Sequence, residues 1–355
     1  MHIPFCRKKC AYCNFHSVSY DDNLASAYIG SLSKQISSLT GRFRTIYIGG
    51  GTPTVLSPEL LLKLLKALRK FTQGSSEATI EANPESIDQR KLSLLVDNGI
   101  NRISIGIQSF NDPKLKIMER AHNAATAKKS VELAHKKGLK NINIDLIFGV
   151  RPQTLKGWKR DLSQAVNLPV KHISCYGLDC RKLEASDEVC AGMYGYTIDF
   201  LRKEGFEQYE ISNFARKGFR CRHNLTYWDN EQYIGLGPSA VSYVDGRRYE
   251  LISGVDEYIK GVKSAQTIVA SSENLKRPER AKEAAAVKIR TMQGISFGWF
   301  KRKTNMDFLD LEKDALPGLI EDGLIEYVKG AAGYVAVRLT RKGILFCDIV
   351  SSAFL

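Results

Sequence analysis

The sequence lacks the features that mark membrane, exported and disulfide-rich proteins. No run of about 18 uninterrupted apolar residues occurs, and the first residues, MHIPFCRKKC, lack the apolar segment of a secretory signal. Proline is scarce, with 10 residues in 355, and there is no low-complexity tract. The eight cysteines are too scattered for the disulfide framework of a small secreted domain. We therefore expect a cytoplasmic protein with reduced thiols and without a membrane span.

What the chain does contain is enough apolar material for a large core, together with a strong positive charge. Hydrophobic residues make up 43% of the 355, a length that predicts one large domain and a smaller appendage. The net charge of +14 would attract nucleic acid, an anionic membrane or a polycarboxylate ligand. The basic residues are spread along the chain in short clusters, such as residues 7–9 and 301–303, so a solvated surface explains most of this charge.

The first 215 residues repeat a short β-branched run, a loop and an amphipathic helix, which is the pattern of a parallel sheet with crossover helices. Strands are expected at residues 1–5, 45–48, 78–81, 102–107, 142–147, 172–176 and 208–211. Helices are expected at residues 58–71, 89–98, 124–137, 154–166 and 188–203. About six repeats exceed a small doubly wound sheet and fall short of eight. The prediction is therefore an α/β fold with a partial (β/α)6 barrel over residues 1–215 and a site at the carboxyl ends of its strands.

From about residue 250 the pattern becomes mainly helical. Helices are expected at residues 255–264, 277–292 and 312–322, followed by two strands around a glycine-containing turn and a last helix. This outline predicts a winged-helix-like domain over residues 271–355, joined to the barrel by a connecting segment over residues 216–270. No distinct basic recognition helix is visible, so a small cap on the barrel is favoured over a DNA-binding domain.

Three of the eight cysteines, Cys6, Cys10 and Cys13, lie close together in the spacing CxxxCxxC. Chance is a poor explanation for this clustering. Thiolates this close suit an iron–sulfur cluster or zinc, and a four-iron cube held by three cysteines keeps one iron open to a substrate. A zinc site completed by His2 or His16 is a weaker alternative, and a structural disulfide is weaker still.

Glycines and polar residues recur where the predicted strands end. The segment GGGTPT, with Gly50, Gly51 and Thr52, follows the strand TIYI, so the backbone can approach a ligand there, although a tight turn would use glycines too. Other strand ends carry polar side chains that a strand core has little reason to contain. These are Glu81, Gln108 and Asp145, with Arg120 close behind. Together they indicate a site for the amino, hydroxyl or carboxylate groups of a polar small molecule.

The segment CRHNLTYW combines His223 with Tyr227 and Trp228. A histidine with flat aromatic neighbours would suit a heme, with one axial nitrogen and rings against the macrocycle. A packed core histidine is the commoner use of such a pattern, and from the residues alone it is the favoured interpretation. Cys221 is a second possible soft ligand.

These segments together resemble the radical S-adenosylmethionine proteins related to oxygen-independent coproporphyrinogen III oxidase. The resemblance covers nearly the whole chain and is carried by HIPFCRKKCAYCNF, YIGGGTPT, EANPE, NRISIGIQSFND, NINIDLIFG, YEISNFAR, CRHNLTYW and YIGLGPSA. Two features favour the branch of HemW-type heme chaperones. The oxidases resemble CxxxCxxCxC, whereas Phe15 stands at the last position here, and the HNxxYW motif of the chaperones is present.

The resemblance implies a 4Fe-4S cluster on Cys6, Cys10 and Cys13, S-adenosylmethionine on the fourth iron, and heme bound through His223. It also implies the residues that border the S-adenosylmethionine pocket, namely Tyr12, Gly50, Gly51, Thr52, Glu81, Gln108, Arg120 and Asp145. The implied function is to bind heme and pass it to apo-proteins. The resemblance leaves open the acceptor, for which a respiratory-chain protein is one candidate, and the formation of a homodimer.

The sequence departs from the family pattern in three places. The chain begins directly before HIPFC, which shortens the first strand, and GVRPQT places Arg151 where the family has a proline. In the shortened segment CRKLEASDEV, Cys180 stands near the position of a family glutamate, for which Glu184 could substitute. Two other functions are weighed beside the chaperone. One is anaerobic decarboxylation of coproporphyrinogen III to protoporphyrinogen, which suits a basic protein, and the other is nucleic-acid binding by the C-terminal wing, which is not expected.

Overall fold

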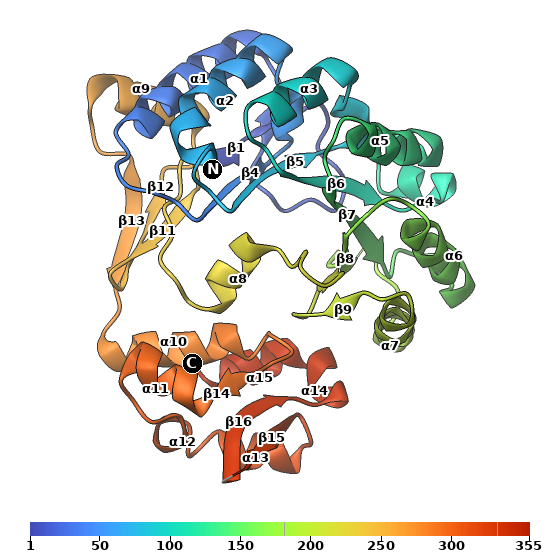
Figure 1. The fold of residues 1–355 in the computed structure, drawn as a ribbon, viewed down its shortest axis with the longest axis vertical. Helices are drawn as coiled ribbons and strands as arrows, with labels where there is room; N and C mark the ends of the chain where they lie inside the picture. Colours follow the sequence, from blue (N-terminus) through green and yellow to red (C-terminus); the bar gives the residue numbers. More distant parts are fainter. Residues whose placement is uncertain (181, 332) are drawn as a thin grey trace.

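Six parallel strands form the partial barrel that the repeating pattern predicted (Figure 1). The structure is a computed structural model that describes all residues except 181 and 332. The parallel strands pair in the order β1 (His2–Ile3), β4 (Thr45–Gly50), β5 (Glu77–Ala82), β6 (Arg102–Gln108), β7 (Asn141–Phe148) and β8 (His172–Gly177). Their isoleucine-rich runs are buried on both faces, as a parallel sheet covered by helices requires. The predicted α/β barrel is confirmed.

The last predicted strand of the barrel, at residues 208–211, is wrong. Strand β9 covers only Glu207–Gln208, and β10 (Asn213–Ala215) pairs antiparallel with both β9 and β8. Between them the chain turns back, because the backbone N–H of Ser212 donates to the Glu210 carboxylate at 3.2 Å. The N–H of Tyr209 also donates to the Asn213 carbonyl at 3.1 Å, so residues 209–213 form a turn and not a continuous strand.

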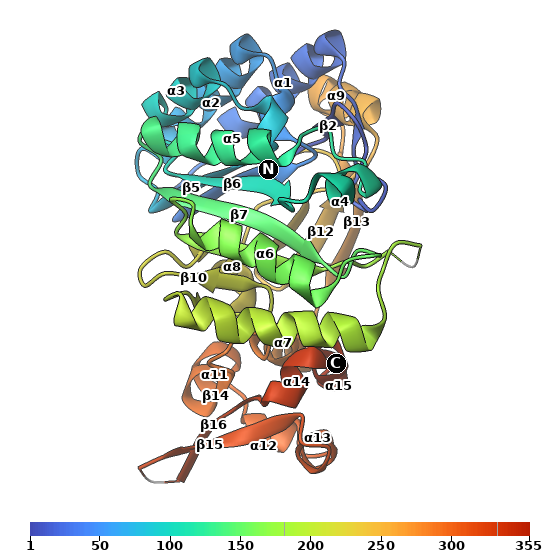
Figure 2. The same cartoon turned by 90° about the vertical axis from the view of Figure 1, so that its right-hand side faces the viewer.

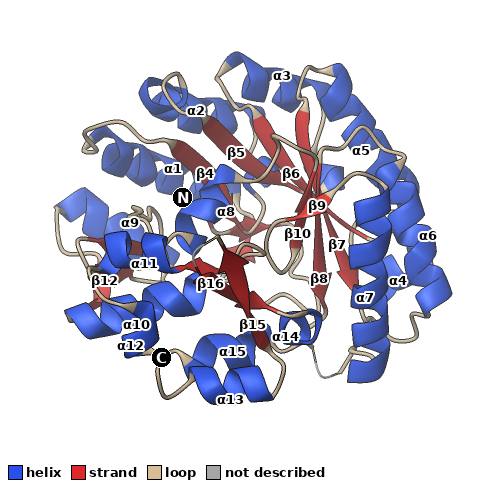
Figure 3. Cartoon of the chain, turned by 60° about the horizontal axis from the view of Figure 1, so that its bottom comes forward, coloured by secondary structure: helices blue, strands red, loops and turns tan. Residues whose placement is uncertain are grey.

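Helices cover the outer face of the barrel (Figure 3). They are α1 (Asp22–Ser37), α2 (Pro58–Thr72), α3 (Gln89–Asp97), α4 (Asp112–Ile117), α5 (Ala124–Lys136), α6 (Leu155–Val166) and α7 (Asp187–Lys203). In α2, Ser57 caps the first turn, Pro58 begins the helix, and a leucine stripe is buried against the sheet. The sequence analysis did not identify α1 and α4, since small and polar residues interrupt the apolar stripe of α1 and α4 is short.

The segment after the barrel contains more strand than expected. Helix α8 (Arg222–Trp228) is followed by an antiparallel sheet of β11 (Val241–Val244), β12 (Arg247–Leu251) and β13 (Val269–Asn274), with α9 (Val255–Ser264) between the last two strands. Helix α9 packs on α1. Helix α8 lies at the amino ends of the barrel strands, whereas the loop after the short strand β2 (Phe5–Cys6) lies at their carboxyl ends (Figure 2).

The C-terminal domain has a hydrophobic core of its own, with Phe300 and Phe308 at its centre. Its elements are α10 (Arg277–Lys288), β14 (Ile295–Ser296), α11 (Phe297–Thr304), α12 (Phe308–Leu311), α13 (Leu316–Glu321), β15 (Ile325–Gly330), β16 (Gly333–Leu339), α14 (Arg341–Leu345) and α15 (Cys347–Ala353). The helix expected at 312–322 begins later, because Glu312 closes the preceding short helix. The two strands and the last helices match the winged-helix outline, and α13 carries no basic residue. Within the described residues, every helix is too short or too polar to traverse a lipid bilayer.

Candidate functional site

A cavity of about 580 Å³ lies at the carboxyl ends of the barrel strands, and we call it the barrel cavity. Eleven of the twelve residues that the sequence analysis singled out line it: Cys6, Cys10, Tyr12, Cys13, Gly50, Gly51, Thr52, Glu81, Gln108, Arg120 and Asp145. The twelfth, His223, does not line this cavity. The sequence analysis therefore placed eleven residues correctly around one cavity, and the twelfth lies outside it.

The three cysteines of the CxxxCxxC spacing are free thiols that face the barrel cavity. The Cys6 Sγ atom lies 3.6 Å from the Thr52 hydroxyl, and the Cys13 N–H donates to the Cys10 carbonyl at 3.1 Å. Among the described residues, no three histidine, cysteine or acidic side chains converge closely enough to hold one metal ion. Three thiols spread around a cavity fit a group with several metal atoms better than a single zinc ion.

His2 does not complete a zinc site. Its two ring nitrogens contact the backbone carbonyls of Pro238 and His16. The segment that carries Cys6, Cys10 and Cys13, which we call the cysteine loop, packs with its backbone against the segment that follows β4. A Cβ atom on Gly51 would lie 2.6 Å from the Phe5 carbonyl oxygen and 3.0 Å from Cys6 Sγ, so only glycine allows this approach.

Arg120 ties the cysteine loop to the ends of two strands. Its Nη1 atom donates to Cys10 Sγ at 3.3 Å and to the Tyr12 hydroxyl at 3.4 Å. Its Nη2 atom donates to Asn83 Oδ1 at 2.7 Å and to the Gly106 carbonyl at 2.9 Å. The guanidinium thus places a donor and a positive charge beside Cys10, and a thiolate is the form of cysteine that binds metal.

Asn83 is a central residue of the site that the sequence analysis missed. Its side-chain amide accepts from Arg120 and donates to the Thr52 hydroxyl at 2.9 Å, and Thr52 in turn reaches Cys6. Its position two residues after Glu81, in EANPE, is the signal that could have identified it, because alternate strand residues share a face.

Glu81 is held by two donors inside the barrel cavity. The Tyr47 hydroxyl donates to Oε1 at 2.6 Å and the Gly50 N–H donates to Oε2 at 3.1 Å. Desolvation outweighs these bonds and raises the pKa of Glu81 to about 7. Gly50 has φ of +113°, and a Cβ there would collide with the His2 ring at 1.9 Å. The glycines of GGGTPT therefore allow the backbone of this segment to lie close to the Phe5 backbone and to the Glu81 carboxylate.

The floor of the barrel cavity is polar. Asp145 accepts from Asn143 at 2.8 Å and from the Ser104 hydroxyl at 3.1 Å, while desolvation raises its pKa. Gln108 has φ of +66° at a register shift in β6, which brings its side chain to the rim. Other polar lining residues that the sequence analysis did not single out include Arg102, Ser104, Asn143, Ser174, Tyr176, Asp179 and Asn224.

His223 lies on α8, at the amino ends of the barrel strands (Figure 2), and the next residue of this helix, Asn224, lines the barrel cavity. The buried Glu77 carboxylate fixes the start of this helix by accepting from the N–H of Arg222 at 2.9 Å and of His223 at 3.0 Å. The side chain lines a second cavity of about 810 Å³, which we call the seam cavity because it follows the edge of β4. Three residues, Phe15, Tyr47 and Gly50, line both cavities.

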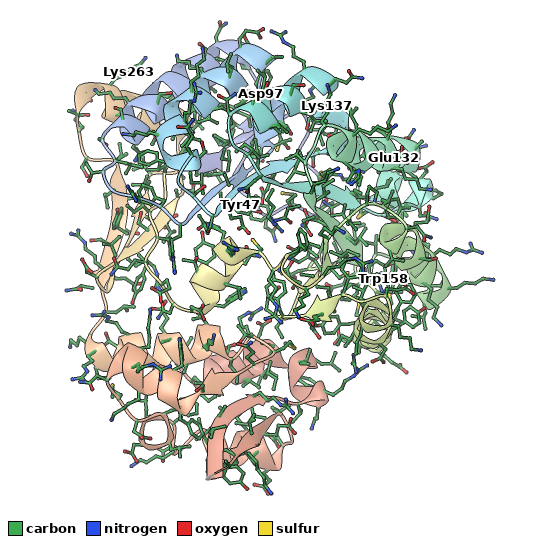
Figure 4. All side chains as sticks on the ribbon, in the orientation of Figure 1. Tyr47, Asp97, Glu132, Lys137, Trp158 and Lys263 are labelled. Carbon is green, nitrogen blue, oxygen red and sulfur yellow. The ribbon has the colours of Figure 1, made fainter. Side chains whose placement is uncertain are left out.

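Four side-chain contacts surround the His223 imidazole. Nδ1 lies 2.9 Å from the Thr45 hydroxyl, and Nε2 lies 3.0 Å from the Tyr227 hydroxyl. The Tyr47 ring stacks on it with centroids 5.0 Å apart and planes at 19°, while the Tyr227 ring packs edge-on. Figure 4 shows Tyr47 between the barrel strands and α8. Desolvation lowers the pKa of His223 to about 3, so the imidazole is neutral at pH 7.

Neither Trp228 nor Cys221 lines the seam cavity, so in this structure neither side chain faces the space that His223 faces. The Trp228 ring packs under the Arg290 guanidinium, 5.5 Å from its centroid, and lines neither cavity. Cys221 is buried, and its thiol donates to Glu77 at 3.4 Å. The seven-residue helix α8 turns these side chains to different sides.

Of the residues by which the sequence departs from the family pattern, Arg151, Cys180 and Glu184 do not line the barrel cavity. Cys180 packs in a small apolar cluster with Leu178, and Glu184 pairs through its backbone with Val150. Neither lines the cavity, whereas Asp179 does, so the expectation that Glu184 replaces the family glutamate is not met. Arg151 precedes a cis peptide bond to Pro152.

Comparison with known proteins finds relatives along the whole chain. Residues 1–165 match the family model described as the radical SAM superfamily. The heme chaperone HemW of Lactococcus lactis is 35% identical, over 91% of this chain and 89% of the relative. The heme chaperone HemW of Bacillus subtilis is 34% identical, over 100% and 98%. Among solved structures, coproporphyrinogen III oxidase (HemN) of Escherichia coli is 22% identical with a TM-score of 0.86, covering 99% of this chain and 88% of that one, which shows a common fold.

Proposed function

Because the chain belongs to the HemW family of the radical S-adenosylmethionine superfamily, we propose that it binds heme and transfers it to apo-proteins. The observation that carries the proposal is the match to HemW proteins over the full chain, which includes the HNLTYW motif with a neutral histidine facing a cavity. Family membership also implies a 4Fe-4S cluster and S-adenosylmethionine. When bound, the cluster supplies one-electron reduction and an open iron for the amino and carboxylate groups of that cofactor.

The barrel cavity is where we place the cluster and the nucleoside. Cys6, Cys10 and Cys13 would hold the cluster, which their free thiols around one cavity support. Gly50, Gly51 and Thr52 would border the methionine end of the cofactor, and Glu81 its polar groups. The remaining residues of the neighbouring pocket are Tyr12, Gln108, Arg120 and Asp145. Arg120 would hold the cysteine loop in place through Cys10 and Tyr12.

His223 is the heme ligand that we propose. A neutral imidazole can offer a nitrogen lone pair to iron without first losing a proton, and the pKa of His223 is lowered far enough for this at neutral pH. His223 is proposed in preference to Cys221, which is buried against Glu77 and lines neither cavity.

An anaerobic heme titration of the cluster-reconstituted protein tests this function. We expect the parent to show a saturable, stoichiometric Soret band that weakens or shifts in His223→Ala. The matched control is His135→Ala, which removes a partly exposed histidine on α5 that lines neither cavity. Equal affinity in the parent and His223→Ala would show that the ligand is wrongly assigned, and no specific binding in any variant would reject the function.

The oxidase alternative is not favoured. The HemW relatives match over the whole chain, while the likeness to coproporphyrinogen III oxidase, at 22% identity, concerns the fold alone. Phe15, which stands where the oxidases have a cysteine, is 69% exposed where the two cavities meet. An anaerobic assay for protoporphyrinogen, with an authentic oxidase as the positive control, would detect this activity if it existed.

The proposed function extends to location and partners. We place the protein in the cytoplasm, with an apo-heme protein, such as one of the respiratory chain, as acceptor and with a second copy of the chain in a homodimer. Light scattering of the reconstituted protein tests the dimer, and transfer of the Soret band to a candidate apo-protein tests the acceptor. Nucleic acid is not expected as a partner, and salt-dependent binding to a duplex would contradict this.

A further inference from the structure

We propose that Thr45 and Tyr47, two residues of β4 outside the HNxxYW motif, position His223 so that Nε2 is the nitrogen offered to heme iron. In the structure the Tyr227 hydroxyl is the hydrogen-bond partner of Nε2, and heme iron would take its place. The inference rests on the proposed function and deepens it, because it names the groups that set how strongly the histidine binds heme.

Two strand residues act on different parts of the imidazole. Thr45 and Tyr47 are two positions apart on β4, so their side chains project from the same face of the strand. The Thr45 hydroxyl lies 2.9 Å from Nδ1, and the Tyr47 ring stacks on the imidazole at 5.0 Å. Tyr47 is itself held by its 2.6 Å hydrogen bond to Glu81. One contact therefore fixes a nitrogen atom, and the other fixes the plane of the ring.

The two ring nitrogens differ in how easily their partners can leave. Nδ1 is held by Thr45, a short β-branched side chain with one stiff torsion on a strand. Nε2 is held by the hydroxyl at the end of Tyr227, a side chain that is 37% exposed and lines the seam cavity. Tyr227, and not Thr45, is therefore the partner that would give up its nitrogen to heme iron.

Coordination through Nε2 requires the imidazole hydrogen to be on Nδ1. In that tautomer the Nδ1–H donates to the Thr45 hydroxyl oxygen, which lies 2.9 Å away and is free to accept it. Histidine ligands of metals usually donate their second N–H to such a partner, which fixes the ring and makes it a stronger base. Thr45 is thus a positioning residue for the proposed heme ligand.

Substitutions of Thr45 distinguish a role of its hydroxyl in positioning His223 from a role of its side chain in packing alone. Thr45→Val keeps the shape of the side chain but leaves Nδ1–H without an acceptor, so we expect heme affinity to fall roughly 10- to 100-fold and the Soret band to shift. Thr45→Ser should restore both values to those of the parent. The matched control is Thr79→Val on β5, where the replaced hydroxyl is buried without a hydrogen-bond partner. It should leave heme binding unchanged.

Replacing Tyr227 should act in the opposite direction. Tyr227→Phe removes the hydroxyl that iron must displace, so we expect heme to bind about 2- to 10-fold more tightly, as the loss of one competing hydrogen bond allows. The control Tyr249→Phe removes a hydroxyl on β12 that lines neither cavity and should have no effect. A folding defect would weaken binding in every variant and cannot produce this gain.

The outcomes separate this inference from the proposed function. The inference is overturned if His223→Ala loses heme while Thr45→Val binds it like the parent, if Thr45→Ser fails to rescue, or if Tyr227→Phe weakens binding. If the parent binds no heme, or if His223→Ala binds it as tightly as the parent, the proposed heme site itself is wrong and the inference falls with it.

Discussion

At the scale of single residues, Arg120 joins three chain segments at the barrel cavity through one planar guanidinium. A lysine at this position cannot replace a forked set of donors, because its charge sits on one ammonium. We expect Arg120→Lys to lower the free energy of unfolding by about 1.5–3 kcal/mol and to reduce the iron retained per chain after reconstitution. The control Arg160→Lys changes an exposed arginine on α6. Equal iron retention in both variants would contradict the role of Arg120.

A second prediction at this scale concerns Glu312, which is buried in the C-terminal domain with Oε1 unpartnered. Desolvation raises its pKa from 4.5 to about 7. The folded chain therefore retains a proton on Glu312 that the unfolded chain releases. The ionised Glu312 carboxylate destabilises the folded chain, and this effect is absent below pH 4.5 and complete above about pH 7. Glu312→Gln should raise the free energy of unfolding at pH 8 by about 1–3 kcal/mol and change it little at pH 4.

Thermal unfolding at the two pH values checks the prediction for Glu312. Glu321→Gln is the control, since Glu321 is exposed on α13. A gain in stability of the same size at both pH values would indicate improved packing rather than removal of a buried charge.

At the scale of elements, α8 is held in place by a residue far away in the sequence. Glu77, at the start of β5, accepts hydrogen bonds from two backbone N–H groups at the start of this helix and from the Cys221 thiol. Glu77→Gln retains one acceptor oxygen and adds an amide that faces these donors, so the start of α8 should loosen. We expect a loss of about 1–3 kcal/mol in the free energy of unfolding and faster hydrogen exchange at the amides of Arg222 and His223.

The control for this element is Glu207→Gln on β9, which removes one side of an exposed ion pair with Arg220. Such a pair contributes about 0–1 kcal/mol, and α8 exchange should not change. Unaltered exchange in Glu77→Gln would show that the helix is held by its other contacts, such as those with β4 and α10.

At the scale of the whole molecule, the C-terminal domain and the barrel have separate hydrophobic cores. We propose that the chain is organised as a partial barrel over residues 1–215, a connecting segment over residues 216–270 and a C-terminal domain over residues 271–355. Phe300 is 0% exposed in the second core, so Phe300→Ala should destabilise that core by about 3–5 kcal/mol. Because the ion pairs that join it to α8 and the following loop are partly exposed, iron retention and heme affinity should stay at parental values. A parallel loss of iron would show that the two cores unfold as one.

The sequence by itself determined the repeating strands and helices and brought together a set of residues that line the barrel cavity. Hydrophobic periodicity is a local signal, and it placed the five longer parallel strands within two residues of their observed ends. The site residues follow from the same logic, because the carboxyl ends of parallel strands always meet at one face. Cys6, Glu81 and Asp145 could therefore be assigned to one cavity from their positions along the chain.

Only the tertiary structure decided where the HNLTYW helix lies and what surrounds His223. Residues as distant as Thr45, Tyr47 and Glu77 contact this helix, and no local pattern encodes such pairings. The antiparallel end of the barrel and the sheet of β11 to β13 were missed for the same reason, since strand partners are chosen by the closure of the chain in space. Local periodicity thus specifies elements and their common edge, whereas the contacts that tune one side chain depend on which distant residues the fold brings beside it.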